Sequence, residues 1–123
     1  MEKKQNKRAK GEYYELMAKR YLEQHQLIFI QRNFHSKTGE LDLIMRDRDS
    51  FVFVEVKYRA TSNYGSAQEM VTWQKQRKLQ RTALFWLMKN GLSGEHTSFR
   101  FDVVAIHSQG KEINWIKNAI VEG

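Results

Sequence analysis

The stretch Phe51–Tyr58 constrains the fold most, because two kinds of side chain alternate along it. Every second position holds a valine, and the positions between them hold two phenylalanines and two charged residues: Phe51, Val52, Phe53, Val54, Glu55, Val56 and Lys57. Successive side chains of a strand point to opposite faces of the sheet. The valine face must therefore be covered by another layer, while Glu55 and Lys57 share the other face.

The remaining segments predict an α/β fold. Apolar residues at helical spacing indicate a helix over about Lys7–Gln24. A second helix is expected to start at the capping box Ser66–Glu69, to break near Thr72 and to stop at Asn90-Gly91. Strands are predicted over Leu27–Phe34, Glu40–Met45, Phe51–Tyr58, Phe99–Ile106 and Glu112–Lys117.

The order is therefore α-β-β-β-α-β-β. A helical connection as long as the one between the third and fourth strands predicts that these two strands are parallel. The expected fold is a mixed central β-sheet flanked by helices, formed by residues 1–123 as a single domain. The basic residues 1–10 are expected to form a mobile N-terminal arm.

The composition excludes some kinds of site and indicates a class of binding partner. The chain has no cysteine, so disulfides and thiolate metal sites are excluded. The sequence contains no membrane-spanning apolar run and no signal peptide, so a cytoplasmic protein is expected. The net charge is +7, and the residues between Glu69 and Glu95 contain no acid but five cations: Lys75, Arg77, Lys78, Arg81 and Lys89. Such a field attracts nucleic acid, although a solvated basic surface is the alternative.

The second and third strands are predicted to pair as a hairpin. The polar residues Arg46–Ser50 must hold the turn, and a loop symmetric about Arg48 and Asp49 puts Asp42 opposite Glu55. Directly opposed residues have Cβ atoms roughly 4.5–5.5 Å apart. Because Arg-Asp is not the Asn-Gly signal of a tight turn, a four-residue loop of the same symmetry is expected.

Two opposed carboxylates could hold one divalent cation, because a hard ion such as Mg²⁺ prefers oxygen ligands and removes their repulsion. Glu40 is the alternative ligand if the register is offset. The alternative interpretation of Glu55 and Lys57 is an ordinary salt bridge between positions i and i+2 of a half-exposed strand.

Of three further charged residues, two have two interpretations each and the third has one. Glu15 lies at the edge of the apolar stripe of the first helix, and is either a site residue or an ordinary solvent-facing glutamate. Lys75 points either toward the sheet or outward as a surface lysine. Asp102 is interpreted as a structural residue paired with Arg59 or Arg100.

Taken together, several short motifs resemble the YraN family. They are Gly11-x-x-x-Glu15, Arg32-Asn33-Phe34, Gly39-Glu40-Leu41-Asp42-Leu43-Ile44, Phe53-Val54-Glu55-Val56-Lys57-x-Arg59 and Arg100-Phe101-Asp102-Val103-Val104-Ala105. That family is similar in fold to restriction endonucleases and archaeal Holliday-junction resolvases, the PD-(D/E)XK superfamily. One departure is that Leu41, and not proline, precedes Asp42.

The resemblance implies a nuclease that uses Mg²⁺ or Mn²⁺ to hydrolyse phosphodiester bonds, with branched DNA as one candidate substrate. It implies that the catalytic residues are Glu15, Asp42, Glu55 and Lys57. The metal would be held by Asp42, Glu55 and the carbonyl of Val56. Flanking phosphates would be held by Arg59, Lys75 and Lys78. DNA is expected rather than RNA, and a homodimer is an open alternative because resolvases cut symmetrically.

Two other functions are kept as alternatives. A nucleic-acid-binding module of the same fold without hydrolysis explains the basic charge equally well. An adaptor for a partner protein would use exposed aromatic residues, although these four are expected to pack in the core or in loops: Tyr58, Tyr64, Trp73 and Trp115.

Overall fold

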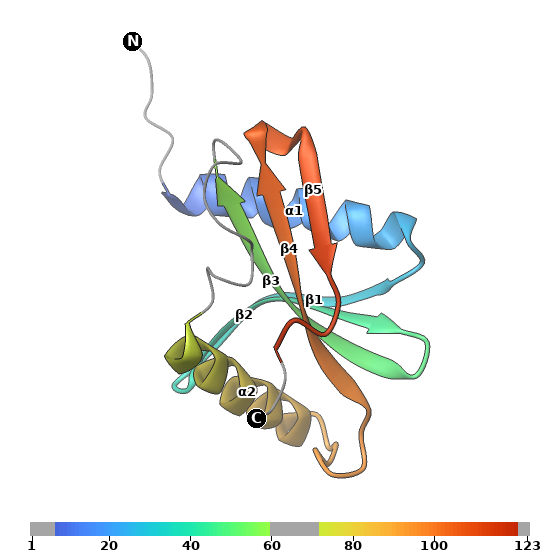
Figure 1. Cartoon of the computed structure of the whole chain (residues 1–123). Helices are drawn as coiled ribbons and strands as arrows, with labels where there is room; N and C mark the ends of the chain where they lie inside the picture. Colours follow the sequence, from blue (N-terminus) through green and yellow to red (C-terminus); the bar gives the residue numbers. More distant parts are fainter. Residues whose placement is uncertain (1–6, 60–71, 121–123) are drawn as a thin grey trace.

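The protein is built around a five-stranded sheet, as the computed structural model of residues 7–59 and 72–120 shows (Figure 1). The helices are α1 (Lys7–Gln24) and α2 (Trp73–Lys89). The strands are β1 (Ile28–Ser36), β2 (Gly39–Asp47), β3 (Ser50–Arg59), β4 (Phe99–His107) and β5 (Glu112–Ile116), with a short 3₁₀ turn η2 (Ser108–Gly110) before β5.

The sheet is mixed. The strands lie in the order β1-β2-β3-β4-β5, and every neighbouring pair is antiparallel except β3 and β4, which are parallel. The predicted order of elements, the mixed sheet and the parallel pair are thereby confirmed.

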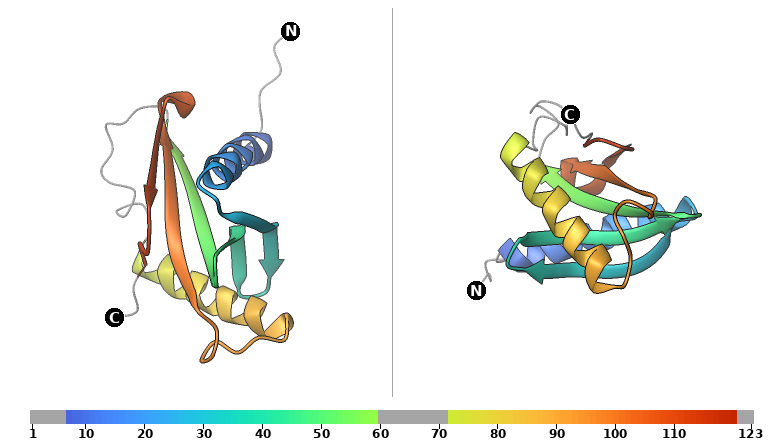
Figure 2. Two further views of the ribbon diagram at one scale, coloured as in Figure 1. Left: turned by 90° about the vertical axis from the view of Figure 1, so that its right-hand side faces the viewer. Right: turned by 90° about the horizontal axis from the view of Figure 1, so that it is seen from below.

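One helix covers each face of the sheet (Figure 2). On one face, Tyr14, Ala18 and Leu22 of α1 pack on the valines of β3, as the alternation predicted. On the other face, α2 packs on aromatic residues such as Phe53. Successive side chains of β3 alternate between the two cores, so Glu55 and Lys57 lie on the same face as Phe53, the α2 face.

Local signals fix the ends of α2. The Thr72 hydroxyl oxygen accepts a hydrogen bond from the backbone N–H of Lys75 at 3.2 Å, so Thr72 is the N-cap of α2. Its backbone is extended, with φ −68° and ψ 162°, at the position where a break was predicted. The helix stops at Asn90, and Gly91 has a φ of +76°, a conformation that favours glycine. The predicted capping box Ser66–Glu69 lies outside the described residues.

The predicted N-terminal arm, residues 1–10, lies only partly within the described residues. Residues 1–6 lie outside the described part of the chain, whereas residues 7–10 form the first turn of α1.

Asp102 is a structural residue, as expected. It is fully buried in β4, and its carboxylate accepts hydrogen bonds from the Arg100 guanidinium at 3.0 Å, the Trp115 indole at 2.9 Å and the Asn118 backbone at 2.9 Å. Of the two partners considered from the sequence, Arg100 is the one that pairs with Asp102.

The aromatic residues considered as interface anchors behave differently from one another. Tyr58 stacks on Tyr14 with ring centroids 4.5 Å apart, and Trp115 packs edge-on against Tyr21. Trp73, in contrast, is 67% exposed, so its predicted role in packing is wrong. Tyr64 lies outside the described residues. Neither described helix is long and apolar enough to cross a membrane.

Candidate active site

The β2–β3 hairpin has the predicted register. Its paired residues run from Asp47 opposite Ser50 to Leu43 opposite Val54, and continuing by one residue places Asp42 across from Glu55. The loop itself contains two residues, so the expected four-residue loop is wrong. Arg48 adopts a φ of +58°, and the guanidinium of Arg46 donates to its carbonyl at 3.0 Å, which supports a tight turn without the Asn-Gly sequence.

Beyond the pair Leu43 and Val54, a side chain of β2 makes a hydrogen bond to the backbone of β3. Asp42 Oδ2 accepts a hydrogen bond from the backbone N–H of Val56 at 2.9 Å. In a strand the N–H and C=O of one residue point to the same side. The Val56 carbonyl therefore faces β2, on the side where the Asp42 carboxylate lies.

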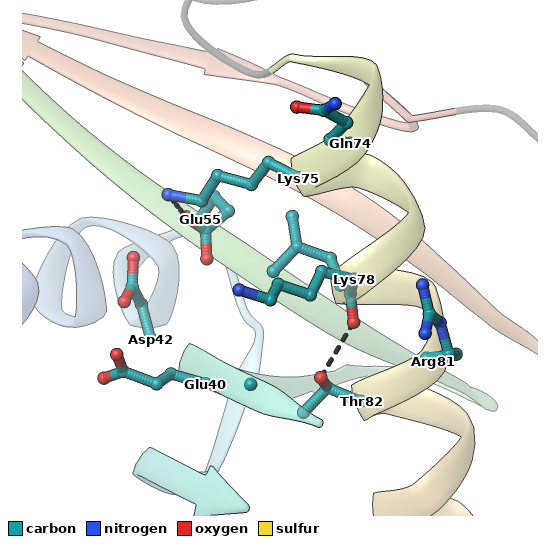
Figure 3. A pocket seen from close by; sticks show the side chains of 10 residues that line it. Glu40, Asp42, Glu55, Gln74, Lys75, Lys78, Arg81 and Thr82 are labelled. Carbon is teal, nitrogen blue, oxygen red and sulfur yellow. Dashed lines mark hydrogen bonds and ion pairs between the residues drawn. The ribbon is translucent and has the colours of Figure 1, made fainter. Parts of the chain in front are cut away.

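A cleft of about 620 Å³ opens between this end of the hairpin and α2 (Figure 3). The two strands contribute the acids Glu40, Asp42 and Glu55, and α2 contributes mostly polar and basic side chains. The α2 residues that line it are Gln74, Lys75, Lys78, Leu79, Arg81 and Thr82.

Gly39 allows β2 to approach α2 closely. Its φ is +144°, and a Cβ at this position would lie 2.9 Å from Thr82 Oγ1. A side chain here would therefore push the start of β2 away from the helix and widen the cleft.

Glu55 is the most deeply buried acid of the cleft, at 5% exposure. Its Oε1 lies 3.3 Å from Lys75 Nζ and 3.8 Å from Lys57 Nζ. Burial, followed by repulsion from Asp42, raises the pKa of Glu55 from 4.5 to about 7, although both lysines oppose the rise.

Asp42 has the same conflict. Burial is the largest influence and raises its pKa, while the hydrogen bond from Val56 and the charges of Lys75 and Lys57 act in the other direction. Two carboxyls whose charged forms are disfavoured thus share one cleft, which is a frequent property of functional sites.

The two lysines respond in opposite ways. Burial and the neighbouring Lys75 lower the pKa of Lys57. Burial is the largest single influence on Lys75 and acts to lower its pKa, but the attraction of Glu55 and Asp42 and the hydrogen bonds to Glu55 and Lys57 together leave the pKa raised. Of the two interpretations of Lys75, the one that points it toward the sheet is confirmed.

Glu15 approaches the site from α1. Burial and repulsion from Asp42 raise its pKa to about 7, while Arg32 and the Asn33 side-chain amide act to lower it. One carboxyl oxygen, Oε1, is buried without a hydrogen-bond partner, and so is Nη1 of Arg32. Buried polar atoms without a protein partner are commonly satisfied by bound water.

Not all of the predicted site residues line the cleft. Lys78 does, and Glu40 does as well, although Glu40 is exposed and pairs with His35 Nδ1 at 3.1 Å. Arg59 is exposed, donates to the carbonyl of Tyr58 at 3.1 Å and is absent from the cleft lining. Glu15, Val56 and Lys57 are also absent from the lining, and Lys57 reaches the site through its contact with Glu55.

Sequence reasoning missed several residues that surround the site. Arg81 lies two turns after Gln74 on α2, and helical spacing from Lys78 could have indicated it. Arg32 and Asn33 belong to one of the sequence motifs, but the sequence does not show that they interact with Glu15. The interaction joins two different elements, β1 and α1.

Comparison with known proteins gives the family. The model of the family described as "Uncharacterised protein family UPF0102" matches residues 14–106, which include every candidate site residue. This chain belongs to the UPF0102 family. The resemblance to the YraN family is thereby confirmed at the level of the family.

Several UPF0102 proteins are closely similar to this chain. The UPF0102 protein of Aliivibrio salmonicida is 92% identical over 123 residues, the whole of both chains. Those of Photobacterium profundum and Vibrio vulnificus are 56% and 53% identical over 118 residues, covering 96% of this chain and 94% and 97% of theirs. The names of these relatives state the family and no activity.

Proposed function

We propose that this protein is a metal-dependent nuclease of the PD-(D/E)XK type, in which Asp42, Glu55 and Lys57 are the motif residues. The observation that carries the proposal is the convergence of Asp42 and Glu55 in one cleft, with raised pKa values and Lys57 beside them. The mixed sheet with α2 between the parallel strands β3 and β4 is compatible with the restriction endonuclease-like fold.

The donor atoms at the site fit a hard divalent cation. Asp42, Glu55 and the Val56 carbonyl would hold Mg²⁺ or Mn²⁺ through oxygen, the ligand that these ions prefer. Among the described residues, no group of three or more acidic or histidine side chains forms a complete metal cage. Mg²⁺ is usually held by one or two carboxylates together with water and substrate phosphate.

When bound, the ion would activate water for attack on phosphorus and offset the charge of the scissile phosphate. Lys57 would orient the attacking water and stabilise negative charge that develops on the phosphoryl oxygens. Glu15 would position water through its unpaired Oε1. Lys75 and Lys78 would bind flanking phosphates, which position the strand without reading its sequence.

Metal binding is the first test. Calorimetric titration with Mn²⁺ should give one saturable site in the wild type and none in Asp42→Asn. Glu40→Gln is the matched control, because Glu40 lines the same cleft from the same strand but is exposed. If the wild type takes up no Mn²⁺, or if Asp42→Asn binds it as well as the wild type does, the metal site is refuted.

Hydrolysis is the second test. Purified protein with Mn²⁺ should cut at least one of four substrates: branched DNA, nicked DNA, single-stranded DNA or RNA. Lys57→Ala should remove cutting while Mn²⁺ binding persists, because the ammonium is not a metal ligand. A wild type that leaves all four substrates intact would sink the proposal.

A nucleic-acid-binding module without hydrolysis is the second candidate. The observation that favours it is the pair of lysines next to Glu55, which already offset its charge without a metal. Such a module would retain oligonucleotide binding in EDTA but would show no Mn²⁺ site in the titration above.

A further inference from the structure

The α2 side of the cleft ends at an exposed tryptophan. Trp73, the first residue of α2, is 67% exposed, and the guanidinium carbon of Arg77 lies 5.0 Å from the centre of its ring. An arginine at this distance holds the ring by a cation–π interaction. Within residues 7–59 and 72–120, the Trp73–Arg77 stack is not part of either hydrophobic core.

The stack is continuous with the wall of the cleft. Residues four apart are neighbours on a helix surface, so Trp73, Arg77 and Arg81 form one row along α2. The adjacent row contains Gln74 and Lys78, which line the cleft, and Arg81 lines the cleft as well. Figure 3 shows Lys75 and Lys78 reaching from this helix toward Glu55 and Asp42. A strand leaving the carboxylates across α2 would therefore pass from Lys75 and Lys78 onto the stack.

The charge of the helix fits a polyanion there. The α2 sequence contains five basic residues and no acid, and four of the five lie between positions 75 and 81. Phosphates would be attracted along this part of the helix.

We propose that Trp73 and Arg77 form a stacking site for an unpaired base, so that the substrate of the cleft is a nucleic acid with a single-stranded segment. This rests on the proposed function only in requiring that the cleft binds nucleic acid. Within a duplex, bases stack on one another and offer no free face. An unpaired base offers its π-face to an aromatic ring or an arginine plane, whatever its identity.

A second copy of the chain is the rival occupant of this face. Leu84 and Met88 are exposed farther along α2 and could contribute an apolar contact. Two α2 helices packed against each other would, however, bring together two sets of basic residues with no acid on either helix. The charge of α2 therefore favours the nucleic acid.

The experiment measures binding in EDTA, where hydrolysis does not interfere. Fluorescein-labelled oligo(dT), oligo(U) and a blunt duplex of two complementary strands are titrated with protein, and anisotropy is read. Trp73→Leu should weaken oligo(dT) binding by roughly 5- to 150-fold, the effect expected of one lost base stack, and change duplex binding little. Trp73→Phe should keep most of the affinity, because it retains a ring. The oligo(U) arm reports whether RNA is accepted equally well.

Met88→Ala is the matched control, since it removes an exposed apolar side chain from the other end of α2. It should leave oligonucleotide binding unchanged. Because Trp73 is exposed, its variants should unfold within a few degrees of the wild type, and comparison of Leu with Phe holds the position constant.

The base-stacking site is overturned if Trp73→Leu binds oligo(dT) as the wild type does, or loses oligo(dT) and duplex affinity equally. It is also overturned if the variant changes only self-association in sedimentation, which would assign the face to a second copy. A wild type that cuts nothing but binds oligo(dT) through Trp73 refutes the nuclease alone. An active nuclease whose binding ignores Trp73→Leu refutes the stacking site alone.

Discussion

Glu15 and Glu55 reach the same pKa of about 7 from opposite faces of the sheet, one on α1 and one on β3. Asp42 lies between them and raises both values, after burial has made the larger contribution. The three carboxyls thus act as one electrostatic group. Their charged forms repel, and two lysines compensate only Glu55 at contact distance.

This repulsion predicts how stability depends on pH. A folded-state pKa raised above the unfolded value means that the native protein binds more protons, so stability falls as pH rises between about 4.5 and above 7. The glutamine of Glu15→Gln stays uncharged as the pH rises, so this variant does not acquire the repulsive charge. It should therefore match the wild-type melting temperature at pH 4.5 and exceed it at pH 8 in thermal unfolding monitored by circular dichroism.

Glu12→Gln is the control for this comparison, because Glu12 is an exposed acid on the same helix. Its advantage at pH 8 should be much smaller. Equal melting temperatures of Glu15→Gln and the wild type at pH 8 would show that the Glu15 carboxyl is not held in a repulsive environment.

Lys75 competes with a divalent cation for Glu55, because its ammonium already lies 3.3 Å from the carboxylate. Lys75→Gln should tighten Mn²⁺ binding at pH 8 by roughly fivefold, which corresponds to the ~1 kcal/mol of a partly exposed ion pair. Calorimetry measures the change, and Lys89→Gln on the same helix should cause none. Weaker Mn²⁺ binding in Lys75→Gln would mean that this lysine supports the metal site.

At the scale of elements, the sequence predicted what regular patterns encode. The periodicity of Lys7–Gln24 gave the bounds of α1, and the valine alternation gave the two faces of β3. The register of the hairpin followed because a polar turn lies between two apolar strands, and a shift of one residue would expose the valines.

Features that depend on contacts between distant segments could not be predicted. Arg48 has a positive φ although it is neither glycine nor asparagine, the residues that usually indicate this conformation in a sequence. Trp73 was expected to pack, since no local pattern tells a buried tryptophan from an exposed one at the start of a helix. The lining of the cleft by Arg81 required the position of α2 relative to β2.

The contact between β2 and α2 is therefore a sensitive point of the fold. Gly39→Ala would place a methyl group 2.9 Å from Thr82 Oγ1 in a backbone conformation that L-residues rarely adopt. It should lower the free energy of unfolding by about 1–3 kcal/mol in urea titrations. It should also weaken Mn²⁺ binding, because the start of β2 carries Asp42.

Gly11→Ala provides the opposite case. Gly11 is within α1 and nothing lies within 4 Å of its added Cβ. Alanine should raise the free energy of unfolding by about 0.5–1 kcal/mol, the usual gain in a helix. A stability change of the same sign in both variants would contradict the close packing of Gly39 on α2.

At the scale of the whole molecule, the two faces of the sheet have different roles. The α1 face is an apolar layer against the valines of β3, whereas the α2 face combines a core with an open cleft. The net charge of +7 is accordingly not spread evenly, since α2 alone carries five cations and no acid. The face that bears the cleft should therefore make the larger contribution to the attraction of a polyanion.

Salt dependence tests this arrangement. Each phosphate neutralised by a cation releases counterions, so the logarithm of affinity falls linearly with the logarithm of salt concentration. Lys78 lines the cleft, and Lys78→Gln should reduce the magnitude of that slope for oligo(dT) by about 1 and weaken binding to different sequences alike. Lys89→Gln removes the same charge from the far end of α2, outside the cleft lining, and should leave the slope nearly unchanged. If both variants reduce the slope equally, the nucleic acid responds to net charge alone, and the cleft is not its binding surface.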